Sequence, residues 1–190
     1  MQIENYLKMN SDLSSFNNSW YKPGHKLKLL IWFFCNAFIL QNKYNPFSSL
    51  KVTILKLFGA KIGRGVVIKQ SVSIKYPWKL RIGNNSWIGE NVWIDNLDEV
   101  SIGDNVCISQ GALLLCGNHN FKKSTFDLMI GKITLENGVW IGAKSIVTQG
   151  VVCKSHSILA VNSVASSNLE KFSVYRGNPA LKIKDRIIES

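Results

Sequence analysis

The sequence has few residues that could crosslink a fold or hold a metal. Its 190 residues include four cysteines, and their spacings match neither a zinc site nor a compact disulfide framework. We therefore expect reduced thiols, a cytoplasmic protein and no bound metal. Histidine is also scarce, with three residues, so each can be considered individually. The cysteines are Cys35, Cys107, Cys116 and Cys153.

Acidic residues and long apolar runs are also few. Twelve Asp and Glu stand against 23 Lys and Arg, and the net charge of +11 favours anionic partners such as phosphorylated cofactors or membrane surfaces. The basic residues are scattered and no nucleic-acid module is recognisable, so we do not expect nucleic acid as a partner. The most apolar run, residues 27–40, is shorter than the roughly 20 residues that span a bilayer. The first 25 residues are too polar for a signal peptide.

What the sequence does contain is a repeat. An aliphatic residue recurs every six positions, except that the first three sets of three are separated from one another by eight. A period this regular indicates a solenoid. The repeating positions are Ile62, Ile68 and Ile74; Ile82, Ile88 and Ile94; Ile102, Ile108 and Leu114; and then Leu135, Ile141, Val147, Cys153, Leu159 and Ala165.

Each six-residue unit can form one short strand and one turn. In the run from Val92 to Ile94 the outer two side chains would point inward and Trp93 outward. Glycines directly after the inward residue, such as Gly83, allow a sharp turn because they carry no Cβ. Three units then make one coil of a triangular prism with an aliphatic interior. We predict an all-β parallel helix of strands over residues 61–170, with its handedness left open by the spacing.

The middle residues of many units, which would point outward, are apolar as well. A solvated surface would not have this composition, so we expect these residues to mediate association of subunits. They are Val67, Trp87, Trp93, Leu113, Trp140, Ile146, Val152, Ile158 and Val164.

The flanking segments differ from the repeat. Residues 1–60 form an N-terminal extension in which residues 27–40 predict a helix and residues 48–58 form a second amphipathic piece. The first helix has two interpretations, packing on the prism or on a neighbouring subunit, or docking at a membrane interface with the help of nearby lysines. Residues 171–190 form a basic tail, for which we predict a short C-terminal helix. The nearby lysines are Lys22, Lys26, Lys28 and Lys43.

The repeat is interrupted once, by the loop 116–132, and this loop contains His119. Gly117, Asn118 and Asn120 beside it are small or polar and leave room for a ligand. The pKa of a free imidazole, near ~6.5, suits the removal of a proton from a hydroxyl at neutral pH. The sequence alone also allows His119 to be a loop histidine without a catalytic role.

These hexads, together with the runs 116–121, 139–151 and the tetrapeptide GNPA at 177–180, resemble the hexapeptide-repeat acyltransferases. Within them the chain is most similar to the colanic acid biosynthesis acetyltransferase type, over about residues 61–186. The resemblance implies a left-handed parallel β-helix, a homotrimer with active sites between neighbouring prisms, and acetyl-CoA as the acyl donor.

The resemblance also assigns roles in catalysis. His119 aligns with the catalytic base, which implies direct transfer of the acetyl group to a hydroxyl, with backbone N–H groups stabilising the oxyanion. A residue of the preceding coil would orient His119, and Asp95 and Asn96 are the candidates. Cys116 as a nucleophile is a minor alternative, because nothing in the sequence would activate its thiol.

For the acyl donor, the resemblance points to the later coils and the tail. The hexad from Leu159 to Asn162 lacks the glycine that is usual at this place in the family, which bears on the local contacts. Small residues and backbone groups would line the pantetheine arm, and cations would contact the phosphates. The candidates are Trp140, Gly142, Ala143, Ala160 and Val161 for the arm, and Arg176, Lys182 and Lys184 for the phosphates.

The function implied is an acetyl-CoA-dependent O-acetyltransferase acting on a saccharide hydroxyl in surface polysaccharide biosynthesis. The acceptor would be a saccharide or a nucleotide-linked or lipid-linked sugar. Two alternatives remain: the same chemistry on an amino sugar, an antibiotic or serine, and a catalytically silent trimeric scaffold. We expect a cytoplasmic location, with peripheral contact to the inner membrane surface through residues 27–40 as a further expectation.

Overall fold

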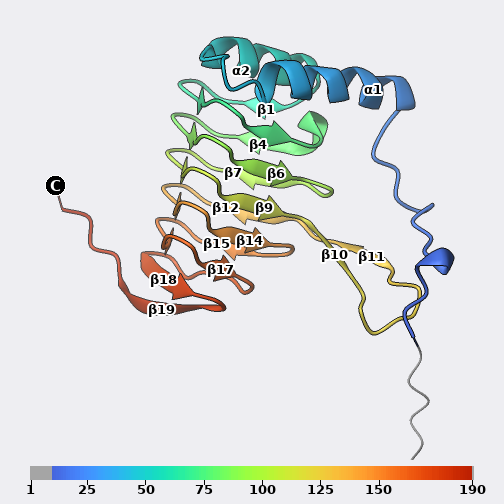
Figure 1. The fold of residues 1–190 in the computed structure, drawn as a ribbon. Coiled ribbons are helices and arrows are strands. Elements are labelled where there is room, and N and C mark those ends of the chain that lie inside the picture. The colour runs from blue at the N-terminus through green and yellow to red at the C-terminus, as the bar shows by residue number, and fades with distance from the viewer. Residues whose placement is uncertain (1–9, 190) are drawn as a thin grey trace, which may run out of the picture.

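The computed structural model describes residues 10–189, and in it the chain forms a triangular prism of stacked coils (Figure 1). Each coil gives one short strand to each of three parallel sheets, which form the three faces of the prism. Strands pair one coil apart, so that Ile62 lies beside Ile82 and Ile82 beside Ile102. The predicted parallel β-solenoid is confirmed. Paired residues of the first three coils are 20 positions apart in the sequence, which is the length of one such coil.

The three faces are named here A, B and C in the order in which the chain visits them. Face A consists of β1 (Lys61–Ile62), β4 (Leu80–Ile82), β7 (Val100–Ile102), β12 (Ile133–Leu135) and β15 (Val152–Cys153). Face B consists of β2 (Val67–Ile68), β5 (Trp87–Ile88), β8 (Cys107–Ile108), β13 (Trp140–Ile141), β16 (Ile158–Leu159), β18 (Ser173–Gly177) and β19 (Ala180–Asp185). Face C consists of β3 (Ser73–Ile74), β6 (Trp93–Asp95), β9 (Leu113–Leu115), β14 (Ile146–Thr148) and β17 (Val164–Ala165).

The aliphatic residues of the repeat fill the interior of the prism. Ile68, Ile88 and Ile108 follow one another down the inside of face B and are fully buried. Cys153 takes an inward position and is also buried, whereas Cys107 points outward and is exposed, as the spacing predicts. The core is therefore a continuous column that runs through all coils.

Insertions into the six-residue unit all fall at one edge, where the chain passes from face C to face A. The first coil turns here through the 3-10 helix η3 (Pro77–Lys79), and the second through residues 96–99. The third coil carries the loop 116–132 at this edge, where β10 (Gly117–His119) and β11 (Leu128–Ile130) form an antiparallel hairpin. We call this the insertion edge. A packed interior excludes extra residues, so they can only project outward here.

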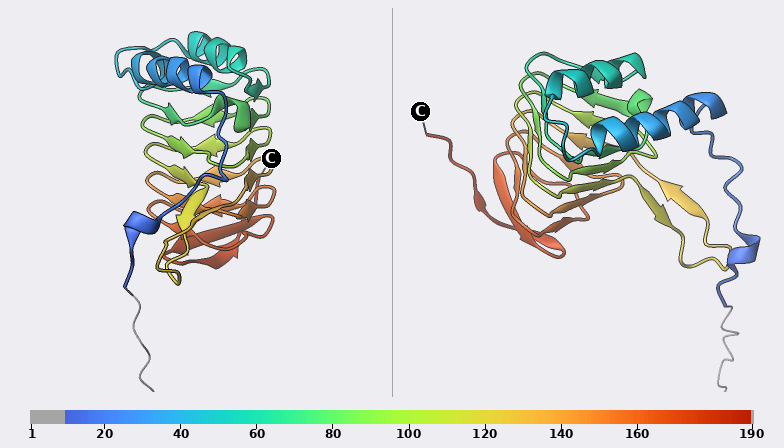
Figure 2. Two further views of the ribbon diagram at one scale, coloured as in Figure 1. Left: turned by 90° about the vertical axis from the view of Figure 1, so that its right-hand side faces the viewer. Right: turned by 45° about the horizontal axis from the view of Figure 1, so that its top comes forward.

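Two helical segments close the first end of the prism (Figures 1 and 2). They are α1 (Lys26–Cys35), continued by the π-helical turn η2 (Asn36–Leu40), and α2 (Ser48–Leu57). The helix predicted over residues 27–40 is confirmed, and the amphipathic piece at 48–58 is helical as well. Trp32 Nε1 donates to the Ile74 carbonyl at 3.0 Å, and Lys51 Nζ donates to the Lys69 carbonyl at 2.7 Å. These bonds satisfy backbone groups that the first coil would otherwise leave open. Between residues 10 and 189, no helix has the length and apolar character needed to cross a membrane.

The other end of the prism is closed by strands, so the predicted C-terminal helix is wrong. After β18 the chain turns at residues 177–180 and returns as β19, antiparallel to β18. The open edge of the last coil offers unpaired backbone groups, and pairing with them outweighs local helix propensity. The alternation of apolar and charged residues from Leu181 to Asp185 is the strand signal that indicates this outcome.

The segment before α1 crosses the insertion edge (Figure 2). It contains the single 3-10 turn η1 (Leu13–Ser15). Tyr21 Oη donates to the Leu97 carbonyl at 2.7 Å, and Trp78 Nε1 donates to the Pro23 carbonyl at 2.8 Å. Nearer the N-terminus, the Asp12 amide donates to the carbonyl of Ser124, at the hairpin tip, at 2.9 Å. The segment is thus fixed at both the edge and the hairpin.

Lys51 gives the first testable prediction. Its side chain is fully buried, and burial lowers its pKa. Lys51→Ala would remove both the packed methylene chain and the partner of the Lys69 carbonyl, and we expect a loss of about 2–4 kcal/mol in unfolding free energy. Lys56→Ala, on the exposed side of the same helix, should change it by less than about 0.5 kcal/mol. Denaturant melts of both variants measure this, and equal stabilities would show that Lys51 does not anchor the cap.

Candidate active site

His119 lies on the hairpin that projects from the insertion edge. It is the last residue of β10, directly opposite Leu128 of β11. Its ring stacks on Phe126, with centroids 4.5 Å apart and an interplanar angle of 8°, and Phe16 of the N-terminal segment packs on it at 5.6 Å. The half-buried imidazole is therefore held by two aromatic rings from different parts of the chain.

A backbone carbonyl determines which nitrogen of His119 carries the proton. Nδ1 lies 2.9 Å from the carbonyl oxygen of Phe126, and a carbonyl can only accept. Nδ1 must therefore be the donor, which leaves Nε2 of the neutral ring with a lone pair. Phe126 has φ of 52°, and this left-handed conformation is part of the turn that directs its carbonyl to the ring. A histidine held in this tautomer is prepared to accept a proton at Nε2.

The side chains of the two residues predicted to orient His119, Asp95 and Asn96, bond to other partners. Asn96 is fully buried and bonds the backbone of Tyr76 twice, through Oδ1 at 2.9 Å and Nδ2 at 2.6 Å. Asp95 is paired with Lys75 at 2.8 Å. Within residues 10–189, no hydrogen bond joins either one to His119. For Asn96 the orienting role does not fit this geometry, because both of its polar side-chain atoms are already used.

Asp95 nevertheless lies close to the base of the hairpin. A Cβ at Gly117 would come 3.9 Å from Asp95 Oδ2 and only 2.5 Å from Leu97 Cδ1, so this position needs glycine. Side chains two residues apart on a strand project from the same side, about 7 Å apart. The His119 side chain therefore leaves β10 on the side that faces Asp95.

Cys116, at the start of the hairpin, is inert in this setting. Its side chain is fully buried, and burial raises the pKa of the thiol to about 12. A thiol with this pKa stays protonated at neutral pH and is a poor nucleophile. The structure therefore gives no support to the alternative of a covalent acyl-cysteine.

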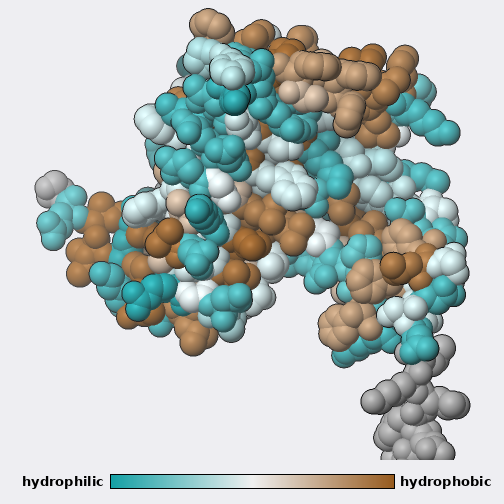
Figure 3. All heavy atoms as spheres, in the orientation of Figure 1, coloured by the Kyte–Doolittle hydropathy of each residue, from teal (hydrophilic) through white to brown (hydrophobic). Residues whose placement is uncertain are grey.

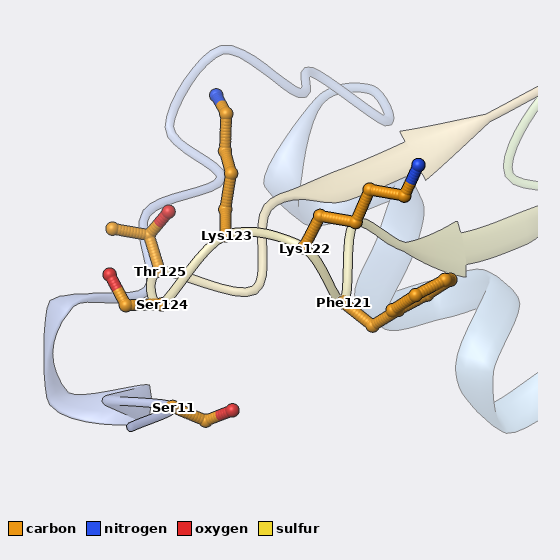
Figure 4. A pocket seen from close by; sticks show the side chains of 6 residues that line it. All are labelled: Ser11, Phe121, Lys122, Lys123, Ser124 and Thr125. Atoms are coloured by element: carbon orange, nitrogen blue, oxygen red, sulfur yellow. The ribbon is translucent and has the colours of Figure 1, made fainter. Parts of the chain in front are cut away.

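One pocket lies at the hairpin tip and a second lies beside α1. The first, of about 360 Å³, lies between the hairpin tip and the N-terminal segment. The side chains of Lys122 and Lys123 extend away from Ser11 (Figure 4), and Lys123 Nζ is bonded to Asp127 at 2.7 Å. The second, of about 330 Å³, lies between α1 and face C, with the Lys75–Asp95 pair and Trp93 in its lining. The first pocket is lined by Ser11, Phe121, Lys122, Lys123, Ser124 and Thr125.

The residues predicted to bind the acyl donor line a different edge, where face B turns into face C. Gly142, Ala160 and Arg176 each directly follow residues that are paired in β13, β16 and β18, so they stack in successive coils. A Cβ at Gly142 would come 2.6 Å from the Val161 amide nitrogen, so only glycine allows the coils to pack there. We call this the small-residue edge. It also contains Ala143, half-buried, and Val161, exposed, while Trp140 lies just before it on face B with Nε1 2.9 Å from Ser109 Oγ.

The three basic residues proposed for the phosphates differ in their surroundings. Lys182 Nζ lies 2.9 Å from both Glu170 and Asp185, and these hydrogen bonds raise its pKa. Its charge is already balanced. Arg176 and Lys184 are exposed, and among residues 10–189 neither is paired with a carboxylate. These two are therefore the better candidates for binding an anion.

His119 and the small-residue edge lie at opposite sides of face C in one chain. Face C lies between the insertion edge, which carries the hairpin, and the edge that carries Gly142 and Ala160. One chain therefore does not bring the predicted base and the predicted donor site together across a single edge. A second prism placed against face C could do so.

Two parts of this site could not be inferred from the sequence. The carbonyl of Phe126 carries no side-chain signature, since any residue could supply it. Phe16 lies in a lead-in without periodicity, so nothing marks it as a neighbour of His119. The described residues also contain no cluster of three or more His, Cys, Asp or Glu able to hold a metal ion.

Solved structures show the same architecture. A hexapeptide-repeat-containing acetyltransferase of Vibrio cholerae superposes with a TM-score of 0.77 at 19% identity, over 84% of this chain and 91% of the other. The same protein in complex with acetyl coenzyme A gives a TM-score of 0.77 at 18% identity, over 86% and 89% of the two chains. At these identities the likeness concerns the fold, which is the left-handed parallel β-helix.

Sequence comparison gives the family. No protein-family model matches the chain. The galactoside O-acetyltransferase of Escherichia coli is 26% identical over 136 residues, 70% of this chain and 67% of that protein. The WcaF protein of Escherichia coli, assigned to colanic acid biosynthesis as an acetyltransferase, is 33% identical over 177 residues, 93% of this chain and 97% of that protein. The chain is therefore a member of the hexapeptide-repeat acetyltransferases, of the colanic acid biosynthesis type, and an acyltransferase that uses acetyl-CoA.

Proposed function

We propose that the protein is an O-acetyltransferase that transfers the acetyl group of acetyl-CoA to a saccharide hydroxyl, in the biosynthesis of a surface polysaccharide. The observation that carries the proposal is His119, held with Nδ1 on the Phe126 carbonyl and with Nε2 available as a base. A scaffold without catalysis would not need a histidine fixed in this tautomer. The polysaccharide context rests on the similarity to WcaF.

In the proposed reaction His119 Nε2 removes the proton of the acceptor hydroxyl. The hydroxyl oxygen attacks the thioester carbonyl, and backbone N–H groups stabilise the oxyanion that forms. The C–S bond then breaks, and the proton on His119 passes to the departing thiolate. No acyl-enzyme is needed, which agrees with the raised pKa of Cys116.

We propose that the active site is completed by a neighbouring prism in a homotrimer. The outward residues of face A are mainly polar, with Arg81, Ser101 and Thr134 paired in a row. Those of faces B and C are mainly apolar, and they include Trp87, Trp140 and Trp93, each about half exposed. In a cyclic trimer each subunit contacts its two neighbours through two different faces. Two apolar faces and one polar face are what this arrangement requires.

The acceptor would bind in the two pockets, one at the hairpin tip and one between α1 and face C. Asp95 is largely buried and lines the pocket beside α1, so its carboxylate is placed to contact a sugar hydroxyl there. Aromatic Trp93 in the same lining offers a flat apolar surface to a sugar ring. We further propose a cytoplasmic location, in keeping with four free cysteines, and membrane contact through residues 27–40.

The second prediction concerns the base. His119→Ala should lower turnover about 10²–10⁴-fold, the usual loss for a general base. The variant should still bind CoA and keep its oligomeric state, because the ring lies on a hairpin outside the prism core. His25→Ala, which changes an exposed residue before α1, serves as the control and should retain activity. Steady-state kinetics with acetyl-CoA and a panel of sugars, amino sugars and serine measure this. Near-normal turnover of the His119 variant would contradict a mechanism with His119 as the general base.

The third prediction concerns assembly. At micromolar concentration, light scattering should give three times the chain mass of 21.3 kDa. Leu113→Glu on face C should dissociate the trimer, because it buries a charge against an apolar partner surface. Thr134→Glu is the matched control, since Thr134 is an equally half-buried middle residue on polar face A. A monomeric wild type, or equal behaviour of the two variants, would contradict the arrangement.

The fourth prediction concerns the tail. Arg176→Glu combined with Lys184→Glu should raise KM for acetyl-CoA about tenfold and change kcat much less, because phosphate contacts hold ground and transition state alike. The effect should weaken with salt, since both side chains are exposed. The matched control is Lys154→Glu combined with Lys171→Glu. Both lysines are exposed and lie at another edge, where the Phe172 amide donates to the Ser155 carbonyl at 3.0 Å. An unchanged KM in the first double variant would place the phosphates elsewhere.

A further inference from the structure

The outer surface of the helical cap is apolar, which is unusual for the end of a solenoid. Terminal units of such folds normally present a polar outer face, because they must cover the last coil and remain in water. Here both α1 and α2 bury one side in the first coil and expose apolar side chains on the other. Figure 3 shows hydrophobic side chains gathered over these two helices.

In α1 the exposed apolar residues form one continuous stripe. They recur at intervals of three and four residues, which places them on one face of a helix. Trp32, on the opposite side, is buried and bonded to the first coil. The stripe consists of Leu27, Leu30, Ile31, Phe34 and, in the following turn η2, Phe38, with exposures between 47% and 70%.

In α2 the same arrangement is repeated. Leu50 and Leu57 are exposed by 45% and 78%, and Phe47 just before the helix by 66%. Lys51 and Leu55, on the other side, are fully buried against the prism. Both helices are anchored to the same end of the prism, so their exposed faces point away from the coil stack. We call the two exposed faces together the apolar cap.

The charges around the apolar cap have a single sign. Between Trp20 and Ala60 the sequence has six lysines and neither an acidic residue nor an arginine. Lys51 is buried, and Lys28 lies over the Trp78 ring at 4.4 Å. Lys22, Lys26, Lys43 and Lys56 are exposed around the two helices. An apolar face surrounded by cations is the pattern of helices that lie in the interface of an anionic membrane.

A second copy of the chain fits this surface less well. Contact between two caps would bring the lysines of one copy against the same lysines of the other, which repel. The opposite end of the prism also exposes Leu181 and Ile183, but it carries charges of both signs. Lys182 is paired there with Asp185 and Glu170, beside Arg176 and Lys184, which have no carboxylate partner among residues 10–189. The segment between Trp20 and Ala60, by contrast, has no carboxylate side chain. Charge therefore distinguishes the two ends and favours an anionic lipid surface at the cap.

We propose that the apolar cap, formed by α1 and α2 together, docks the protein on a membrane rich in anionic lipids, with the prism axis along the membrane normal. The helices lie across the end of the stack, so a plane that touches both crosses the axis (Figures 1 and 2). This extends the contact beyond residues 27–40 and fixes its orientation. It does not depend on the transferase chemistry. In a trimer with parallel axes, three caps would meet the same leaflet, and their binding would be multivalent.

The test is co-sedimentation of the full-length chain with vesicles, without acetyl-CoA or acceptor. The protein should bind vesicles of phosphatidylcholine mixed with phosphatidylglycerol much more strongly than vesicles of phosphatidylcholine alone, and salt should weaken the binding. Leu30→Gln, Phe34→Gln, Leu50→Gln and Leu57→Gln combined should reduce the bound fraction at least about tenfold. All four residues are exposed, so thermal melts should be unchanged.

Two further variants make the test specific. Lys26→Gln, Lys43→Gln and Lys56→Gln combined should reduce binding to the anionic vesicles while leaving the apolar residues in place. Leu181→Gln with Ile187→Gln, which removes exposed apolar residues far from the cap, should bind like the wild type. The proposal would be overturned if the wild type did not bind vesicles, or if the variant with all four leucine and phenylalanine substitutions (the Leu30 series) bound them as well as the wild type does. A change of oligomer size in that series without vesicles would instead identify the cap as a contact between copies. Acetyl transfer by a variant that no longer binds vesicles would leave the proposed function intact.

Discussion

The structure depends on one packing constraint, the inward stack of aliphatic side chains at intervals of six residues. Each strand places the aliphatic side chain of the repeat inside the prism, and hydrogen bonds from coil to coil keep strands such as β2, β5 and β8 in register. The cross-section can hold no additional residue, so every insertion must leave the prism at an edge. All of them leave at the insertion edge. A rigid frame thus carries a hairpin whose position is fixed by the frame, while its sequence is free to serve chemistry.

The same constraint divides the candidate active site. The hairpin with His119 and the small-residue edge with Gly142 belong to different edges of one prism. The outward residues of faces B and C are mainly apolar, and those of face A are mainly polar, so the chain has two surfaces suited to association. In the proposed trimer, catalysis is a property of the assembly. The helical cap adds a third surface, and its apolar and cationic character separates it from the prism faces.

Much of the fold could be predicted because it follows from period and composition. The hexads specify the coils, the interruption at 116–132 locates the hairpin, and the apolar run at 27–40 indicates a helix. The tail was predicted wrongly, because the open edge of the last coil is a tertiary partner that no local pattern displays. The orientation of His119 was missed for a related reason. Its partner is the backbone carbonyl of Phe126, and a backbone group has no identity in the sequence.

Mixed trimers test most directly whether His119 of one subunit works with the small-residue edge of its neighbour. His119→Ala lacks the base, and Ala143→Trp would block the edge; each should be inactive as a homotrimer. When the two are co-assembled at equal ratio, about a quarter of the sites should combine an intact His119 with an intact neighbouring edge, and activity should return to about a quarter of the wild-type value. If mixed trimers form and remain inactive, both halves of the site belong to one chain, which contradicts an active site shared between subunits.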